Sequence, residues 1–195
     1  MDIFIKNISI YGGFAGFILW AVIERAFFMQ NQQQESGRGD DRASYTLISA
    51  CWYAAVIYSL LDAWNFNWSL LPQKLWMLPA AGLLLTAGGL CIRFLSRRTL
   101  GRHYSVRVET SQAHRLVTTG MYRYVRHPAY LGLLCLFFGI PLCEGSWGGL
   151  LLAALGGLPS ILYRIQIEEK ALNQWFGEEY RYYSQNSWRL IPYIW

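Results

Sequence analysis

Apolar residues occur in long blocks along this chain, separated by short polar connections. A helix needs roughly 20 apolar residues to cross a bilayer, and these blocks lack the periodic polar positions of a soluble amphipathic helix. We therefore predict an all-α polytopic membrane protein with about five transmembrane helices. The predicted spans cover about residues 8–28, 45–65, 75–95, 129–144 and 146–163.

The last two predicted spans are short, and only Glu144, Gly145 and Ser146 join them. This spacing predicts a tight C-terminal helical hairpin. Pro141 and the pairs Gly148-Gly149 and Gly156-Gly157 favour a kink or close helix packing, because small residues let helices approach in lipid. We expect residues 1–195 to form a single integral membrane domain, with three spans in 1–95 and the functional loop, hairpin and tail in 96–195.

The distribution of charge predicts the orientation, because cytoplasmic loops are enriched in Lys and Arg. The formal net charge is +5. The connection after the third span has one acid, Glu109, and is surrounded by arginines. These are Arg93, Arg97, Arg98, Arg102, Arg107, Arg115, Arg123 and Arg126. We expect this loop and the C-terminal tail to face the cytoplasm, and the N-terminus to lie outside.

Basic residues interleaved with aromatic ones also occur in nucleic-acid-binding proteins, but no nucleic-acid motif accompanies them here. Arginines beside spans attract anionic headgroups, and the nine Trp and thirteen Tyr fit interfacial belts. We therefore expect membrane lipids as partners and no nucleic acid. The four cysteines lack metal-ligand spacing and are interpreted as buried small hydrophobes. They are Cys51, Cys91, Cys135 and Cys143.

The segment from His114 to Tyr130, HRLVTTGMYRYVRHPAY, concentrates polar chemistry directly before an apolar run. Pro128 suits the first turn of a helix, so we expect His127 at a helix mouth facing water. We predict no metal, because arginines surround the histidines and the segment offers neither a cysteine nor a cluster of acids. Arginines, imidazoles and helix starts instead favour an anionic or carboxylate-bearing ligand.

A second polar cluster follows the last span and contains Arg164, Glu168 and Glu169. Arg164 and Glu168 share a helix face, which by itself predicts a routine ion pair. The pair emerges on the same side of the membrane as His127, however, and charge at the edge of lipid is costly unless it faces a cavity or partner. We therefore expect the two clusters to line one pocket.

Three further charges, Glu24, Arg25 and Asp62, fall near the ends of the first two spans. We interpret them as interface residues that can form structural pairs.

Five separated motifs occur in order over the last hundred residues. They are LG at Leu100-Gly101, HRLVTTGMY from His114 to Tyr122, RHPAY from Arg126 to Tyr130, EE at Glu168-Glu169 and FGEEYRYY from Phe176 to Tyr183. Together they resemble the isoprenylcysteine carboxyl methyltransferase family of integral membrane enzymes. The first two spans resemble nothing specific.

The resemblance implies S-adenosylmethionine-dependent methyl transfer to the carboxylate of a lipid-tailed, isoprenylcysteine-like acceptor. It implies a cytoplasm-facing site in the cell membrane of a prokaryote, or in the endoplasmic reticulum of a eukaryote. Arg164 matches the arginine associated with the substrate carboxylate. The implied cofactor residues are His114, Arg115, Leu116, Val117, Tyr122, His127, Pro128, Ala129, Tyr130 and Glu168. Arg107 stands where eukaryotic members have a glutamine.

Three other functions remain open at this stage. Membrane sterol reductases resemble the same region and bind a reduced nicotinamide dinucleotide there. A methyltransferase acting on a phospholipid amine or a thiol would use much the same cofactor site, but would need a base, for which His103 and His114 are the candidates. A non-catalytic membrane scaffold would retain the fold alone.

Overall fold

The computed structural model describes residues 2–31, 42–72, 77–100 and 116–194. Within these ranges the chain is helical and contains no β-strand. The helical elements are α1 (Asp2–Asn31), α2 (Arg42–Leu61), η2 (Asp62–Phe66), α3 (Met77–Leu100), η5 (Gly120–Arg123), α4 (Pro128–Glu144), α5 (Trp147–Leu152), η6 (Ala153–Gly157), α6 (Leu158–Phe176) and α7 (Glu178–Gln185).

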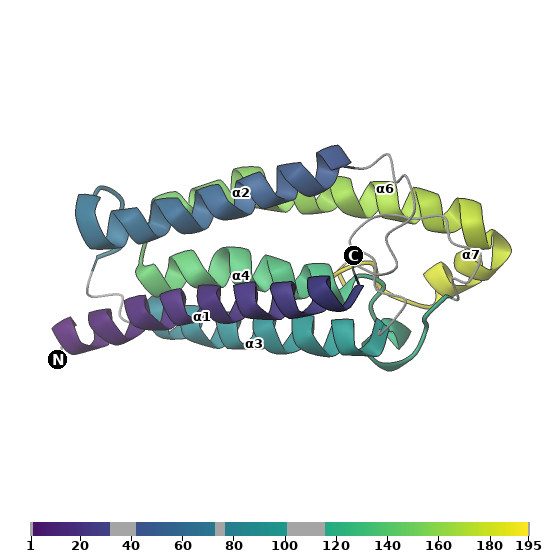
Figure 1. Cartoon of the computed structure of the whole chain (residues 1–195), viewed down its shortest axis with the longest axis horizontal. Helices are drawn as coiled ribbons and strands as arrows, with labels where there is room; N and C mark the ends of the chain where they lie inside the picture. The colour runs from purple at the N-terminus through teal and green to yellow at the C-terminus, as the bar shows by residue number, and fades with distance from the viewer. Residues whose placement is uncertain (1, 32–41, 73–76, 101–115, 195) are drawn as a thin grey trace.

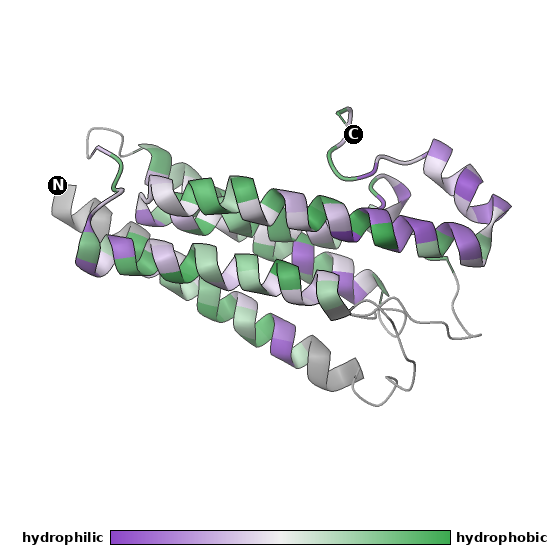
Figure 2. Ribbon diagram, turned by 90° about the horizontal axis from the view of Figure 1, so that it is seen from above, coloured by the Kyte–Doolittle hydropathy of each residue, from purple (hydrophilic) through white to green (hydrophobic). Residues whose placement is uncertain are grey.

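The long helices run along the long axis of the molecule. Helices α1, α3 and α4 pack together on one side, and α2 and α6 pair on the other (Figure 1). One end of the bundle contains the starts of α2 and α4, the end of α6, and α7. We call it the polar end, because hydrophilic residues gather on α6 and α7 there (Figure 2). The far end, opposite, contains η2 and the turn between α4 and α5.

The predicted spans all fall on helices. Three helical segments of the described chain are long and apolar enough to cross a membrane: Ala43–Phe66, Met77–Leu100 and Trp147–Phe176. The helix Pro128–Glu144 is apolar but shorter. The last predicted span ends at residue 163, and the helical segment formed by α5, η6 and α6 continues beyond it to Phe176.

The predicted tight hairpin is confirmed. Gly145 ends α4 with φ 68°, in the left-handed region that glycine adopts without strain. Ser146 begins the next helix, and its hydroxyl accepts a hydrogen bond from the Gly149 amide at 3.2 Å. Helix α4 continues through Pro141, and Gly156 and Gly157 lie in the π-helical segment η6.

Helices α3 and α4 approach each other through glycines. A Cβ atom on Gly89 would lie 2.8 Å from the Gly132 carbonyl oxygen, and one on Gly132 would lie equally close to the Gly89 oxygen. Backbone cannot yield to such contacts, so both positions require glycine. Close backbone approach strengthens helix association in lipid, where the hydrophobic effect does not drive it.

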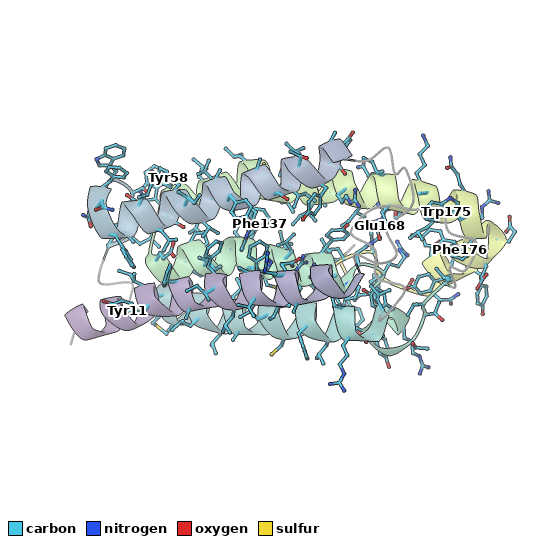
Figure 3. All side chains as sticks on the ribbon, viewed as in Figure 1. Tyr11, Tyr58, Phe137, Glu168, Trp175 and Phe176 are labelled. Carbon is cyan, nitrogen blue, oxygen red and sulfur yellow. The ribbon has the colours of Figure 1, made fainter. Side chains whose placement is uncertain are left out.

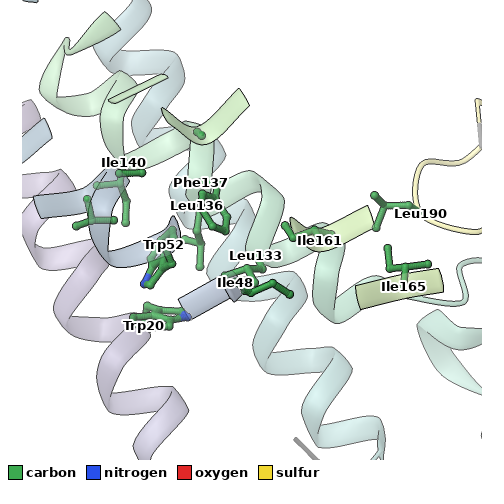
Figure 4. Close-up of a cluster of buried hydrophobic side chains, with 13 residues drawn as sticks. Trp20, Ile48, Trp52, Leu133, Leu136, Phe137, Ile140, Ile161, Ile165 and Leu190 are labelled. Atoms are coloured by element: carbon green, nitrogen blue, oxygen red, sulfur yellow. The ribbon is translucent and has the colours of Figure 1, made fainter. Parts of the chain in front are cut away.

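An aromatic cluster connects the two sides of the bundle. The Trp52 ring of α2 lies between Trp20 of α1 and Phe137 of α4, with ring centroids 4.9 Å apart in each pair. Towards the polar end the core continues through Ile161 and Leu190, which belongs to the C-terminal tail (Figure 4). The tail is therefore anchored in the core of the bundle.

The interpretation of the cysteines was only partly right. Cys143 is buried, and Cys51 and Cys135 are half-buried, but Cys91 is exposed on α3. All four are free thiols. Cys91 lies on a face of α3 away from α4, which hydropathy alone did not reveal.

At the far end a buried carboxylate organises the connections. Asp62 accepts hydrogen bonds from the amides of Trp68 at 2.8 Å and Ser69 at 3.1 Å, and from the Ser69 and Ser146 hydroxyls. The side chain is fully buried. Asp62 therefore lies in the protein interior at the far end of the bundle, and the structural pairing expected for it is with neutral donors.

Candidate functional site

The start of α4 is covered by the C-terminal tail. The Arg126 amide donates to the Trp188 carbonyl at 2.8 Å, and the His127 amide donates to the Arg189 carbonyl at 3.2 Å. His127 precedes Pro128, as predicted, but is only 4% exposed. The expectation that it faces water was wrong. A segment 60 residues later in the chain crosses this helix start, and local sequence does not encode that contact.

Glu169 is the centre of an ion cluster behind His127. Its carboxylate receives the Arg126 Nε at 3.0 Å and the Arg189 Nη2 at 2.8 Å, and lies 3.4 Å from the His127 Nε2. The cluster joins α4, α6 and the tail. Arg126 also donates to the carbonyls of Ser184 and Ser187, so it braces the protein interior and does not anchor the helix at headgroups.

Arg164 lies one turn and a half before Glu169 on α6 and is 3% exposed. Its Nε donates to the Tyr130 hydroxyl at 3.1 Å, and its Nη1 donates to the Ser44 hydroxyl at 2.8 Å. Glu168 is half-buried and interacts electrostatically with Arg164. It lies on α6 on the way to the polar end, before Trp175 and Phe176 (Figure 3).

Tyr130 connects the two clusters. Its ring lies 5.8 Å from the His127 ring, centroid to centroid, and its hydroxyl accepts from Arg164. The polar end therefore contains a continuous series of contacts from Glu169 through His127 and Tyr130 to Arg164. This confirms that the two polar clusters of the sequence lie together, with Tyr130 as the link.

Tyr122 belongs to the short helix η5, between the loop and α4, and is buried. Its carbonyl accepts a hydrogen bond from the Tyr183 hydroxyl at 2.5 Å. Burial raises the pKa of Tyr183 to about 12. Leu116 and Val117 precede η5 and are half-buried. Contacts to α7 thus position the segment that the resemblance assigns to the cofactor.

The first turn of α4 is held from the opposite side by α3. Arg93 donates to the Ala129 carbonyl at 2.8 Å and pairs with Glu24, which also pairs with Arg97. The structural pairing expected for Glu24 is therefore present. Fewer amides at the start of α4 can donate to a ligand than the sequence suggested. Those of Tyr130 and Leu131 already donate to the His127 carbonyl, at 3.1 and 3.0 Å.

Of the residues assigned from sequence, the structure brings together His127, Pro128, Ala129, Tyr130, Arg164 and Glu168 at the polar end. His114 and Arg115 lie outside the described residues, as do His103 and Arg107. Sequence reasoning quoted the Glu168-Glu169 pair but selected only the first. It missed Ser44 and Arg189 entirely, since each lies in a segment without a motif.

Tyr180 was also missed, although the motif from Phe176 to Tyr183 contains it. Its hydroxyl is buried and makes no well-formed hydrogen bond within the described part of the chain. Burial raises its pKa above the ordinary value, and the charge of Glu169 raises it further. A buried polar atom beside two acids is a candidate ligand contact.

Comparison with known proteins agrees with this arrangement. The family model for phospholipid methyltransferases matches residues 77–179. A probable protein-S-isoprenylcysteine O-methyltransferase of Oryza sativa subsp. indica is 32% identical over 165 residues, which cover 81% of this chain and 84% of that protein. The chain belongs to the isoprenylcysteine O-methyltransferase family.

Other members of the family are longer. The protein-S-isoprenylcysteine O-methyltransferase of Rattus norvegicus is 36% identical over 134 residues, which cover 67% of this chain and 46% of the rat protein. The chain therefore spans about half the length of that relative.

The fold extends the likeness to nearly the whole chain. It resembles the structure of the eukaryotic intramembrane Ras methyltransferase, isoprenylcysteine carboxyl methyltransferase, with a TM-score of 0.66 and 25% identity. The match covers 97% of this chain and 68% of that one. With its apolar helices, this makes the protein an integral membrane protein. The family model ends before Arg189 and begins after Ser44, so neither belongs to the matched region.

Proposed function

We propose that this protein transfers a methyl group from S-adenosylmethionine to the carboxylate of a lipid-tailed, isoprenylcysteine-like acceptor at the membrane–cytoplasm boundary. Because the chain belongs to this family, one structural observation is the main support for the proposal. A buried guanidinium, Arg164, lies at the polar end of apolar helices and is held by a phenol and a hydroxyl.

Arg164 is assigned to the acceptor carboxylate. A guanidinium presents a planar set of donors that matches the two oxygens of a carboxylate. It projects from α6, whose preceding turns are apolar, so a lipid tail can lie along the helices while its carboxylate meets the guanidinium. A membrane enzyme thereby acts on an acceptor without extracting it from the bilayer.

The residues of the polar end fit a donor that bears a carboxylate, an ammonium group and a sulfonium. His127 and the nearby arginines suit the carboxylate, and Glu168 suits an ammonium or a hydroxyl group. The rings of Tyr122 and Tyr130 suit a cation or an adenine. We assign the cofactor to these residues with Leu116, Val117, Pro128 and Ala129, and extend the assignment to His114 and Arg115 from the motif.

Bound S-adenosylmethionine supplies an electrophilic methyl group. The acceptor carboxylate is already ionised at neutral pH, so the protein need not provide a general base. Its task is alignment, and holding reactants in line is worth up to roughly 7 to 11 kcal/mol in favourable cases. Arg164 orients the carboxylate, Tyr130 fixes Arg164, and the apolar helices exclude water from the site.

We infer the orientation from charge. The arginine-rich connection between α3 and α4 leads into the polar end, and basic loops remain on the cytoplasmic side. The site would therefore open to the cytoplasm, from which a soluble cofactor enters. The membrane would be the cell membrane in a prokaryote and the endoplasmic reticulum in a eukaryote.

The test is transfer of labelled methyl groups by the purified full chain to prenylcysteine, phospholipid and thiol acceptors. We expect label in the prenylcysteine and its release by mild base, which hydrolyses a methyl ester but not an N-methyl or S-methyl product. Titration with S-adenosylmethionine and with a reduced nicotinamide dinucleotide separates this function from a reductase. Binding of the dinucleotide alone would overturn the proposal.

A phospholipid amine is the second candidate acceptor, because the matching family model is that of phospholipid methyltransferases. An amine must lose a proton during transfer, so this reaction needs a base. Label that resists mild base and remains in phospholipid would favour it.

A further inference from the structure

Arg164 is held by a residue from the half of the chain in which no family motif was found. Ser44 lies in the first turn of α2 and is 1% exposed, and its hydroxyl accepts from the Arg164 Nη1 at 2.8 Å. The two residues are separated by 120 positions in sequence. Because both side chains are buried, this hydrogen bond belongs to the packed interior and is not a chance contact at the surface.

We propose that Ser44 is a positioning residue of the acceptor site, which fixes the Arg164 guanidinium so that it can align the acceptor carboxylate. The inference rests on the proposed function, since it assigns a role toward the same acceptor. It also gives α2 a part in acceptor recognition, whereas the family motifs all lie in the later half of the chain.

The physical argument begins with the flexibility of arginine. An arginine side chain has many rotamers, so an unrestrained guanidinium would lose alignment with its ligand. Ser44 and Tyr130 bind different nitrogens of Arg164, at Nη1 and Nε. Contacts at two nitrogens fix the plane of the guanidinium before any ligand arrives.

The two contacts come from different helices and have different consequences. Tyr130 also faces His127, so it links Arg164 to the cofactor side of the site. Ser44 lies at the start of α2, where the helix carries partial positive charge. Arg164 and the start of α2 together make this region favourable to an anion. The hydrogen bond from Arg164 to Ser44 holds the guanidinium against the start of α2.

This arrangement predicts separable effects. Loss of the Ser44 hydroxyl should weaken binding of the acceptor and leave binding of S-adenosylmethionine unchanged, because Ser44 contacts Arg164, the residue that we assign to the acceptor. The chain offers a matched control in Ser59. It is also fully buried on α2, but its hydroxyl donates to the Ala55 and Val56 carbonyls of its own helix, at 2.9 and 3.1 Å.

The experiment compares Ser44→Ala, Ser44→Thr and Ser59→Ala in the full chain, purified in lipid nanodiscs. Two measurements are made on each. The first is steady-state methyl transfer to an N-acetylated S-prenylcysteine, with a separate titration of S-adenosylmethionine. The second is binding of the same acceptor and of its uncharged carboxamide to the protein without cofactor.

We expect Ser44→Ala to raise the acceptor KM about tenfold or more, the range for one hydrogen bond to a charged group. The affinity for S-adenosylmethionine should stay within about twofold of wild type, a margin of roughly half a kcal/mol. The preference for carboxylate over carboxamide should fall. Ser44→Thr keeps the hydroxyl, so it should restore both the acceptor KM and the preference for carboxylate. Ser59→Ala should behave as wild type.

Three results would overturn the inference: a wild-type KM in Ser44→Ala, an equal loss in Ser59→Ala, or an equal loss in Ser44→Thr. If Ser44→Ala does not fold, Ser44→Cys replaces it, since a thiol of similar shape is a weak acceptor and must raise KM in the same way. If the wild-type protein methylates no carboxylate, the proposed function is wrong. The role of Ser44 is still tested in that case by the binding of the acceptor and of its carboxamide without cofactor.

Discussion

Each end of the bundle contains a carboxylate with little exposure to solvent, fully buried for Asp62 and half-buried for Glu169, and the two are satisfied in opposite ways. At the far end Asp62 accepts only from neutral donors: two backbone amides and the hydroxyls of Ser69 and Ser146. At the polar end Glu169 is met by the cations Arg126 and Arg189 and by His127.

This difference separates a structural network from the network that we propose binds ligands. The hydroxyls around Asp62 also accept from the Gly148 and Gly149 amides, so the network closes on itself and fastens two connections together. At the polar end the buried guanidinium of Arg164 is held by the hydroxyls of Tyr130 and Ser44, close to the ion cluster. Cationic side chains gathered in a protected region favour an anion, and this is the property that an acceptor carboxylate requires.

The largest effect is expected from Glu169→Ala. Removing one partner of a buried pair leaves the other charge uncompensated and costs about 3–5 kcal/mol, and the partial exposure of Glu169 and Arg189 places this loss at the lower end of that range. Arg126 and Arg189 would both lose their carboxylate. Thermal unfolding in detergent and methyl transfer should therefore both decline. Glu178→Ala is the control, because its ion pair with Arg181 is exposed and such pairs contribute about 1 kcal/mol at most.

Asp62→Ala tests the carboxylate at the far end of the bundle. It leaves several buried donors without an acceptor, and we expect the free energy of unfolding to fall by about 2–4 kcal/mol. Folded protein should keep its affinity for S-adenosylmethionine and its acceptor KM. A change in either constant, measured below the unfolding temperature, would show that the far end is coupled to the site.

Arg164→Lys keeps the positive charge but replaces the planar guanidinium with an ammonium group. An ammonium group cannot contact Tyr130 and Ser44 while presenting two parallel donors to a carboxylate. We expect the acceptor KM to rise about tenfold, equivalent to roughly 1.4 kcal/mol, with unchanged cofactor affinity in the folded protein. A wild-type KM would mean that charge alone, and not geometry, is what the acceptor recognises.

The smallest effect concerns α7. Tyr183→Phe removes the hydrogen bond to the Tyr122 carbonyl, which should cost about 0.5–1.5 kcal/mol. The raised pKa of Tyr183 favours the neutral phenol in the folded state. Its contribution is therefore complete below about pH 10 and is lost as pH rises toward 12. Unfolding of wild type and variant should converge over that interval, and parallel curves would contradict this.

Much of the fold was predictable because its signals are local. Apolar blocks located the long helices, and the three residues from Glu144 to Ser146 left room only for a tight turn. The predicted span ends at residue 163 whereas α6 continues to Phe176, because Glu168, Glu169 and Lys170 end the apolar block but not the helix. Hydropathy detects the change in solvent, whereas backbone hydrogen bonds continue past it.

The site was predictable to the extent that its residues lie in motifs. His127, Tyr130, Arg164 and Glu168 could be selected as candidates because they stand in or near motifs of the family beside apolar segments, and the structure places them at one end of the bundle. The burial of His127, the contacts of Glu169 and the part played by Ser44 were not. Each depends on a segment distant in sequence, and no local pattern records such a contact.

The sequence by itself determined that this is a helical membrane protein, which residue types gather at one end, and to which family the motifs are similar. Helix formation and membrane insertion follow from local hydrophobicity and backbone satisfaction. The tertiary structure alone decided which charges are paired. It placed Glu169 among cations and Asp62 among hydroxyls, and joined Ser44 to Arg164, because pairing depends on distances between helices that only packing determines.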